Sequence, residues 1–321
     1  TATPSVAEGG SIIYTANLTS AAQSPVTVTL DNGAVITIAA GSSSGTVSVA
    51  APTDDVYVDA GSVSTTIASA AGGNFESLVV DSTPAVTVVS DTIDVTTVSL
   101  TADASVAEGG SITYTASLTS SAQSPVTVTL DNGAVITIAA GTSSGSVSVA
   151  APTDDVYLDA GSVNATIASA SGGNFENLVV DSMPAVTAVA DTVDVTTASL
   201  TATPSVAEGG SIIYTASLTS TAQSPVTVTL DNGAVITIAA GSSSGNVSVA
   251  APTDDVYVDA GSVSTTIASA TGGNFESLVV DSTPAVTVVS DTIDVTTMSL
   301  TATPNVAEGG SIVYTASLTS A

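Results

Sequence analysis

The sequence predicts an all-β protein, a tandem array of antiparallel β-sandwich domains that forms an extended rod. Three observations lead to this prediction. The chain repeats itself at a spacing of 100 residues, because the motif VAEGGSI recurs from positions 6, 106, 206 and 306. Within each period apolar and polar residues alternate, which is typical of half-buried strands. Clusters of Gly, Asn, Asp and Ser separate the alternating stretches and favour turns.

The length of the period defines the domain organisation. One hundred residues suffice for a whole domain, whereas solenoid turns recur at intervals of about 20–50 residues, which disfavours a β-helix as the competing interpretation. The predicted domains are three immunoglobulin-like repeats and a partial fourth, over residues 1–95, 96–195, 196–295 and 296–321. The last piece carries only two strands, which cannot bury a core alone. It is either cut from a longer array or a strand pair that completes a neighbouring chain.

Seven strands are expected in each repeat, and this number in about 100 residues is typical of an immunoglobulin-like sandwich. The first strand begins near residue 97 of the preceding repeat and ends near residue 7 of its own. The other six strands of the first repeat are expected at 11–19, 25–30, 34–39, 45–50, 61–69 and 84–90. An extra strand within 75–80 is the alternative. Tyr14, Tyr57 and Phe75 are expected to pack in the core or at its corners.

The composition excludes most functional classes. The 321 residues include 29 Asp and Glu but no Lys, Arg, His, Cys or Trp, so the formal net charge is −29. Without cations the chain cannot neutralise phosphates, so we expect no nucleic-acid partner and no direct membrane contact. Disulfides, zinc sites built from Cys and His, and nucleophilic schemes such as Ser–His–Asp are impossible. Catalysis by carboxylates alone needs one acid in an apolar cleft, and we expect no enzyme.

Most acidic residues of a repeat are predicted at one end of the sandwich. Alternating strand directions bring the loops after the first, third, fifth and last strands to this end. In the first repeat these loops carry Glu8, Asp31, Asp54, Asp55, Asp59, Asp91 and Asp94. Asp31 opens an Asp-Asn-Gly hairpin turn, which is a structural role. Glu76 and Asp81 fall at the opposite end, where exposed loop acids need no ligand.

The opposite end of the next repeat faces this acidic end. The junction therefore brings Asp103, Glu176 and Asp181 toward Asp91 and Asp94. Two carboxylates at about 4–5 Å and an effective dielectric of about 20 repel by about 3–4 kcal/mol. Since the chain has no cation to offset this repulsion, either the carboxylates take up protons or a metal ion binds.

Oxygen ligands in arrays of six to eight favour Ca²⁺, whereas Mg²⁺ needs a tighter octahedral site. We expect several Ca²⁺ ions per chain, at the ends of the domains and at the junctions between them. The predicted ligands are Glu8, Asp54, Asp55, Asp59, Asp91, Asp94, Asp103, Glu108, Asp154, Asp155, Asp159, Asp191, Asp194, Glu208, Asp254, Asp255, Asp259, Asp291 and Asp294.

Three motifs in combination resemble a known family. They are Ser5-Val6-Ala7-Glu8-Gly9-Gly10, Asp54-Asp55-Val56-Tyr57 and Asp91-Thr92-Ile93-Asp94. Together they are similar to the immunoglobulin-like extender repeats of giant, type I-secreted, calcium-dependent bacterial adhesins of the biofilm or RTX type. The resemblance covers all three periods and the partial fourth. The Glu-Gly and Asp-Asp elements are more loosely similar to Calx-β calcium-binding domains.

The resemblance implies an extracellular stalk, at the bacterial cell surface or in a secreted matrix, that supports cell adhesion and biofilm formation. In such adhesins calcium between the repeats rigidifies the stalk, which holds a distal ligand-binding module away from the cell. The expected partners are neighbouring repeats of the same long chain and other copies of it. The alternative is a self-assembling extracellular filament or matrix protein with strand donation between chains. This sequence lacks glycine-rich nonapeptide calcium repeats and a recognisable ligand-binding insertion.

Overall fold

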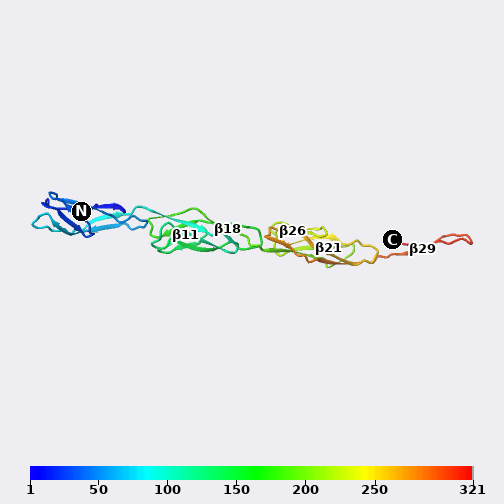
Figure 1. Cartoon of the computed structure of the whole chain (residues 1–321). Coiled ribbons are helices and arrows are strands. Elements are labelled where there is room, and N and C mark those ends of the chain that lie inside the picture. The colour runs from blue at the N-terminus through cyan, green and yellow to red at the C-terminus, as the bar shows by residue number, and fades with distance from the viewer. Residues whose placement is uncertain (320–321) are drawn as a thin grey trace. The chain divides into compact units, whose positions relative to one another are not determined.

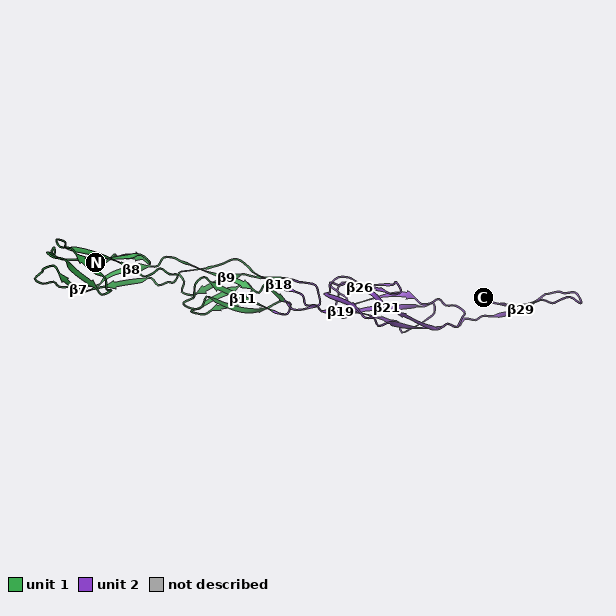
Figure 2. Cartoon of the chain, in the orientation of Figure 1, with its two compact units in different colours: residues 1–106, 111–151, 162–188 green, residues 107–110, 152–161, 189–321 purple. Residues whose placement is uncertain are grey.

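A computed structural model describes residues 1–319. Ser320 and Ala321, the last residues of the predicted fourth repeat, lie outside the described residues. Over the described part of the chain the regular secondary structure consists of strands alone (Figure 1), which confirms the all-β prediction. It includes no helix that could span a membrane. The chain divides into two compact units (Figure 2): unit 1 comprises Thr1–Val106, Ser111–Ala151 and Ser162–Ala188, and unit 2 comprises Ala107–Gly110, Pro152–Gly161 and Val189–Ala321.

The strands recur in the same order from repeat to repeat. Those of the first repeat are β1 (Ser5–Ala7), β2 (Ser11–Asn17), β3 (Val26–Leu30), β4 (Val35–Ile38), β5 (Ser44–Ala50), β6 (Gly61–Thr65), β7 (Ile67–Gly72) and β8 (Ala85–Ser90). Those of the second are β9 (Val95–Ala102), β10 (Ser105–Ala107), β11 (Ser111–Leu118), β12 (Val126–Leu130), β13 (Val135–Ile138), β14 (Ser144–Ala150), β15 (Gly161–Ala165), β16 (Ile167–Gly172), β17 (Asn177–Val180) and β18 (Ala185–Ala190). Those that follow are β19 (Val195–Ala202), β20 (Ser205–Ala207), β21 (Ser211–Leu218), β22 (Val226–Leu230), β23 (Val235–Ile238), β24 (Ser244–Ala250), β25 (Gly261–Thr265), β26 (Ile267–Gly272), β27 (Ser277–Val280), β28 (Ala285–Ser290), β29 (Met298–Ala302) and β30 (Tyr314–Leu318).

Each repeat folds into small hydrogen-bonded sheets. In unit 1 the first repeat forms sheets with the orders β4-β3-β7, β1-β8-β6 and β2-β5. A sheet of the second repeat has the order β14-β11-β9-β17, and unit 2 repeats it as β24-β21-β19-β27. Most pairings are antiparallel, but β1 runs parallel to β8, and β17 runs parallel to β9. The two strands of a parallel pair end on the same side of their sheet, so the residues that follow β1 and β8 lie close together.

The core of each repeat lies between the inner faces of its sheets. Along β2, Ile12 and Tyr14 are 1 % and 2 % exposed, whereas Ile13 between them is 50 % exposed. Side chains of β3 and β4, with Val26 and Ile36 among them, join the same buried cluster. The alternation in the sequence is therefore that of a β-sandwich with a largely aliphatic core.

Two expected strands are interrupted. The one predicted from about residue 97 to about residue 107 is two strands, β9 and β10, with residues 103 and 104 between them. The strand predicted at 61–69 is two strands, β6 and β7, which are separated by Thr66. The carboxylate of Asp31 accepts a hydrogen bond from the backbone N–H of Thr66 at 3.0 Å and another from its hydroxyl at 2.8 Å. The register between β3 and β7 shifts at the same level, between Thr29 and Leu30. These hydrogen bonds lower the pKa of Asp31 and give it a role in shaping the sheet.

The second and third repeats contain the extra strand that was the alternative for residues 75–80. In unit 1, β17 pairs with β9 in parallel, with Asn177 opposite Val95. In unit 2, β27 pairs with β19 in the same way. β9 begins at Val95, so the residues that follow Asp94 belong to a sheet of the next repeat and do not form a free connection.

The turn that precedes β17 depends on its glycine and asparagine residues. Gly173 and Asn174 have φ angles of +87° and +61°, in the left-handed region. A Cβ atom on Gly173 would lie 2.2 Å from Cε2 of Phe175, so only glycine fits beside this ring. The turn thus fixes the direction in which Phe175 and the next residue, Glu176, leave the sheet.

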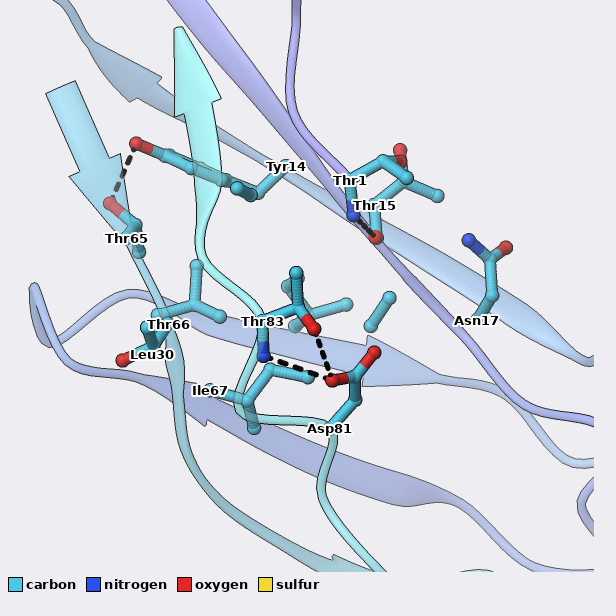
Figure 3. A pocket seen from close by; sticks show the side chains of 13 residues that line it. Thr1, Tyr14, Thr15, Asn17, Leu30, Thr65, Thr66, Ile67, Asp81 and Thr83 are labelled. Atoms are coloured by element: carbon cyan, nitrogen blue, oxygen red, sulfur yellow. Dashed lines mark hydrogen bonds between the residues drawn. The ribbon is translucent and has the colours of Figure 1, made fainter. Parts of the chain in front are cut away.

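One buried hydroxyl differs between the repeats. The hydroxyl of Tyr14 lies 2.9 Å from the hydroxyl of Thr65 (Figure 3), and Tyr214 and Thr265 form the same pair in unit 2. In the second repeat the threonine is replaced by Ala165, and the hydroxyl of Tyr114 is buried without a hydrogen-bond partner. Burial also raises the pKa of Tyr114.

Ala165→Thr is expected to raise the free energy of unfolding of the second repeat by about 1 kcal/mol, because it gives a buried donor its partner. The fold can hold a threonine at this position, because Thr65 and Thr265 occupy the equivalent positions of the other repeats and are only 3 % and 1 % exposed there. Urea unfolding of the full chain measures the change. Thr65→Ala should lower the stability of the first repeat by a similar amount. A neutral or destabilising Ala165→Thr would contradict this explanation.

Candidate metal centre

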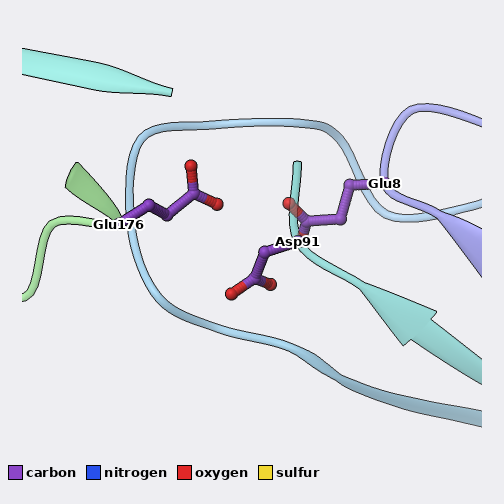
Figure 4. Close-up of side chains that lie close together, drawn as sticks. All are labelled: Glu8, Asp91 and Glu176. Atoms are coloured by element: carbon purple, nitrogen blue, oxygen red, sulfur yellow. The ribbon is translucent and has the colours of Figure 1, made fainter. Parts of the chain in front are cut away.

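Three carboxylates from distant parts of the sequence converge in unit 1. Glu8 follows β1, Asp91 follows β8, and Glu176 precedes β17. One oxygen from each lies within 4.8 Å of the others, and the side chains point toward one space (Figure 4). Glu8 is only 6 % exposed, and the other two are half-buried. We call this group the first cluster.

The parallel pairing of β1 and β8 brings Glu8 and Asp91 together. Ala7 and Ser90 are register partners at the ends of the two strands. One residue further on, the backbone N–H of Glu8 donates to the carbonyl of Ser90 at 3.0 Å. Gly9 then turns with a φ of +69°, and its N–H donates to the carbonyl of Pro52 at 2.7 Å. The chain reversal directs the Glu8 side chain inward.

Glu176 reaches the first cluster from the second repeat. Its backbone N–H donates to the carbonyl of Val56 at 3.1 Å, which fixes it against a loop of the first repeat. Its Oε2 accepts a hydrogen bond from the backbone N–H of Asp94 at 2.6 Å. The junction between two consecutive repeats therefore supplies one of the three carboxylates.

Each of the three carboxylates has a buried oxygen without a hydrogen-bond partner. These oxygens are Oε2 of Glu8, Oδ1 of Asp91 and Oε1 of Glu176. A buried carboxylate without a partner is strongly disfavoured, and no Lys or Arg exists in the chain to pair with it. The donor set consists of hard oxygens only, which is the set that Ca²⁺ binds. The residues present thus fit a hard cation.

The surroundings of Glu8 raise the pKa of its carboxyl group. A hydrogen bond between the carboxyl groups of Glu8 and Asp59 raises the pKa of Glu8 from its ordinary value of 4.5 to about 7, together with burial and the nearby charges of Asp59, Asp91 and Asp55. In the absence of a cation Glu8 therefore takes up a proton at a higher pH than an ordinary glutamate does. Metal binding and protonation of Glu8 therefore compete.

Unit 2 contains two further clusters. The second cluster consists of Glu108, Asp191 and Glu276, and repeats the first in detail, including a 2.6 Å hydrogen bond from Asp194 N–H to Glu276. The third cluster consists of Glu208, Asp259 and Asp291. In the third cluster Asp259 takes the place that Glu176 and Glu276, each from the following repeat, have in the first and second clusters. The pKa values of Glu108 and Glu208 are also raised to about 7, first by hydrogen bonds with Asp159 and Asp259.

Several predicted ligands make other contacts. The Thr92 hydroxyl donates to Asp54, and the equivalent threonines donate to Asp154 and Asp254. Asp55 accepts a hydrogen bond from the N–H of Tyr57 at 2.8 Å, as Asp155 and Asp255 do from the equivalent tyrosines. Asp94 and Asp194 contribute their backbone N–H groups to the clusters, and Asp294 is exposed.

Asp103 is not brought into a cluster. Its carboxylate accepts a hydrogen bond from the N–H of Thr113 at 2.8 Å. The hydroxyls of Thr3 and Thr203 accept the equivalent hydrogen bonds in the other repeats, each at 3.0 Å. Asp181, which was also expected at the junction, accepts a 3.0 Å hydrogen bond from the N–H of Met183.

Glu176 and Glu276 are the cluster residues that we did not include among the predicted ligands. The sequence placed Glu176 near Asp91, but its position in a loop favoured a solvated side chain. The repeated GGNFE motif, which contains both glutamates, could have indicated them. Its glycines hold the turn that aims the glutamate at the preceding repeat.

The pH dependence of the metal-free protein follows from the raised pKa values. Between pH 7 and 4.5 folded Glu8, Glu108 and Glu208 bind protons that the unfolded chain releases, so stability rises as the pH falls. The melting temperature in chelator should therefore be higher at pH 5 than at pH 8. The lowered pKa of Asp31 opposes this trend only below pH 3.8.

The triple variant Glu8→Gln, Glu108→Gln and Glu208→Gln is the control, because it removes the three titrating groups and leaves the rest of the net charge. It should flatten the profile. A melting temperature of the wild-type chain that falls between pH 8 and pH 5 in chelator would contradict the prediction.

Comparison with known protein families gives an informative match. The family model of the LapA domain matches the chain three times, over residues 1–92, 94–192 and 194–292. The matched segments are adhesin-related repeats. A comparison with curated proteins finds no match. Among solved structures, the native conformation of E. coli alpha-2-macroglobulin, determined by cryo-electron microscopy, is 12 % identical with a TM-score of 0.23, and the alignment covers 93 % of this chain and 23 % of that chain. That TM-score is too low to carry an argument.

Proposed function

The chain belongs to the LapA domain family, and on this premise we propose that it is a structural extender segment of a large bacterial surface adhesin. In this proposal the repeats form an extracellular, calcium-stiffened stalk that supports cell adhesion and biofilm formation and has no catalytic role. The observation that carries the proposal is the first cluster, where carboxylates of two consecutive repeats converge on one space.

The chemistry of the cluster supports calcium as the ion. Glu8, Asp91 and Glu176 would hold it through their unpartnered oxygens, with Asp59 beside them, and water would complete the six to eight oxygens that Ca²⁺ takes. The bound ion supplies positive charge to a site that otherwise contains only negative groups. Mg²⁺ fits less well, because it demands a compact octahedron and keeps most of its water.

The ligands of the first cluster come from two repeats, which supports the proposal that a bound ion stiffens the junction. Glu8 and Asp91 belong to the first repeat and Glu176 to the second, so an ion bound to all three would tie the repeats together. Without the ion the same carboxylates repel one another and favour separation. The second cluster has the same arrangement in unit 2. Calcium would therefore change the stiffness of the junctions more than the fold of a repeat.

The calcium affinity expected of such sites supports an extracellular location. Sites of this kind in extracellular modules bind Ca²⁺ with dissociation constants of about 10⁻⁴–10⁻³ M, which suits millimolar calcium outside the cell. The partners in the proposal are the neighbouring repeats of the same long chain. The family match to an adhesin-related repeat supports the same location.

Glu176→Gln tests the proposed ligand set. It should weaken calcium binding at the first cluster by about tenfold or more, because fewer negative ligands lower the affinity of such sites. Isothermal titration calorimetry of the full chain measures the change. Glu76→Gln is the matched control, since Glu76 occupies the same motif position in the first repeat but is exposed and belongs to no described cluster. Equal losses in the two variants would exclude Glu176 as a ligand.

A further inference from the structure

A second contact lies beside the first cluster and involves no charged group. Residues 56–58 of the first repeat run antiparallel to residues 174–176 of the second, with Tyr57 bridged to Phe175. The N–H of Val58 donates to the carbonyl of Asn174 at 3.1 Å, and the N–H of Glu176 donates to the carbonyl of Val56 at 3.1 Å. We call these two segments the clasp.

Aromatic packing reinforces the clasp. The rings of Tyr57 and Phe175 stack with centroids 5.6 Å apart and planes inclined by 24°. Phe175 is 8 % exposed, and Val56 and Tyr57 pack against the core cluster of the second repeat. The Tyr57 hydroxyl donates to the carbonyl of Ser121 at 2.5 Å. The loop of one repeat thus completes the core of the next.

The same clasp occurs in unit 2. Tyr157 stacks on Phe275 at 5.7 Å and 23°, and its hydroxyl donates to the carbonyl of Thr221 at 2.6 Å. The N–H of Leu158 donates to the carbonyl of Asn274 at 3.1 Å, and the N–H of Glu276 donates to the carbonyl of Val156 at 3.0 Å. Recurrence with a different residue in the position of Ser121 shows that the tyrosine recognises a backbone carbonyl.

The clasp shares a residue with the first cluster, and its counterpart in unit 2 shares Glu276 with the second cluster. The backbone of Glu176 belongs to the clasp, while its side chain belongs to the first cluster. Nothing in the clasp requires a cation, since its contacts are apolar, aromatic and backbone hydrogen bonds. The docked contact should therefore persist in chelator and depend only weakly on salt.

We propose that the clasp docks consecutive repeats without metal and that Tyr57 and Phe175 are positioning residues for the junction site. The docked segment presents Glu176 to Glu8 and Asp91 before an ion arrives. Metal binding and docking then strengthen each other by the same factor. The part that concerns metal affinity rests on the proposed function, whereas docking in chelator does not.

Amide hydrogen exchange of the wild-type chain in chelator tests the docking. The N–H groups of Val58, Glu176 and Glu276 should exchange slowly, because they are bonded across the clasp. Fast exchange of these amides, beside slow exchange in the strands, would overturn the proposal. This measurement needs no variant and no calcium, so it remains decisive if the chain binds no calcium at all.

Tyr57→Ala tests the positioning. It should abolish the protection of the Val58 and Glu176 amides in chelator and weaken calcium binding at the first cluster by about tenfold. The clasp that contains Tyr157 in unit 2 is unchanged in this variant and serves as an internal reference. Tyr57→Phe, which keeps the ring but loses the hydroxyl, should retain most of the calcium affinity. Lost protection with unchanged calcium affinity would show that the clasp does not position Glu176.

Discussion

Saturating calcium is expected to raise the melting temperature of the metal-free chain by about 5–20 °C at pH 7.5. With dissociation constants of about 10⁻⁴–10⁻³ M, about 10 mM Ca²⁺ stabilises each site by about 1.4–2.7 kcal/mol. In a domain of about 100 residues, 1 kcal/mol shifts the melting temperature by about 4–8 °C. The effect is large because one ion both satisfies buried oxygens and cancels repulsion within the cluster.

Differential scanning calorimetry in chelator and in calcium measures this shift. Sodium chloride at matched ionic strength controls for screening of the −29 net charge, and magnesium at the same concentration should produce a smaller rise. The triple variant Glu8→Gln, Glu108→Gln and Glu208→Gln should lose most of the calcium response. A wild-type melting temperature that does not change with calcium would contradict metal binding at the clusters.

The sequence carries most of the information about the strands. The alternation in Ser11–Asn17 is confirmed by a strand with the same buried face, because burial of every second side chain is a local pattern. The interruption at Thr66 could not be predicted, since it depends on a hydrogen bond that the Thr66 N–H donates to Asp31, 35 positions away in the sequence. The parallel pairing of β17 with β9 is similarly a tertiary feature.

The candidate site was predictable where the fold places it at strand ends. Glu8 and Asp91 follow paired strands, so loop position alone indicated their proximity. Glu176 required knowledge of how one repeat meets the next. Tyr57 was expected to pack at a core or corner, and it does pack, but against the core of the following repeat. Asp103 illustrates the opposite case, an acid whose partner is a nearby N–H.

Stiffening of the junctions is the central claim of the proposed function. The longest strands have eight residues, and at about 3.3 Å per residue these strands with the loops at both ends make a repeat about 30–40 Å long, so three repeats in line would reach about 100–130 Å. Calcium at the first and second clusters should hold consecutive repeats at a fixed angle. In chelator the clasps should still dock the repeats, but repulsion between the carboxylates should widen the range of angles.

Small-angle X-ray scattering of the full chain in calcium and in chelator tests this claim most directly. We expect the scattering of a stiff rod with a maximum dimension of about 100–130 Å in calcium. In chelator we expect a flexible chain whose circular dichroism remains β-rich. Adding Tyr57→Ala and Tyr157→Ala should increase the flexibility in chelator further. The same maximum dimension and the same flexibility of the wild-type chain in both conditions would contradict calcium stiffening.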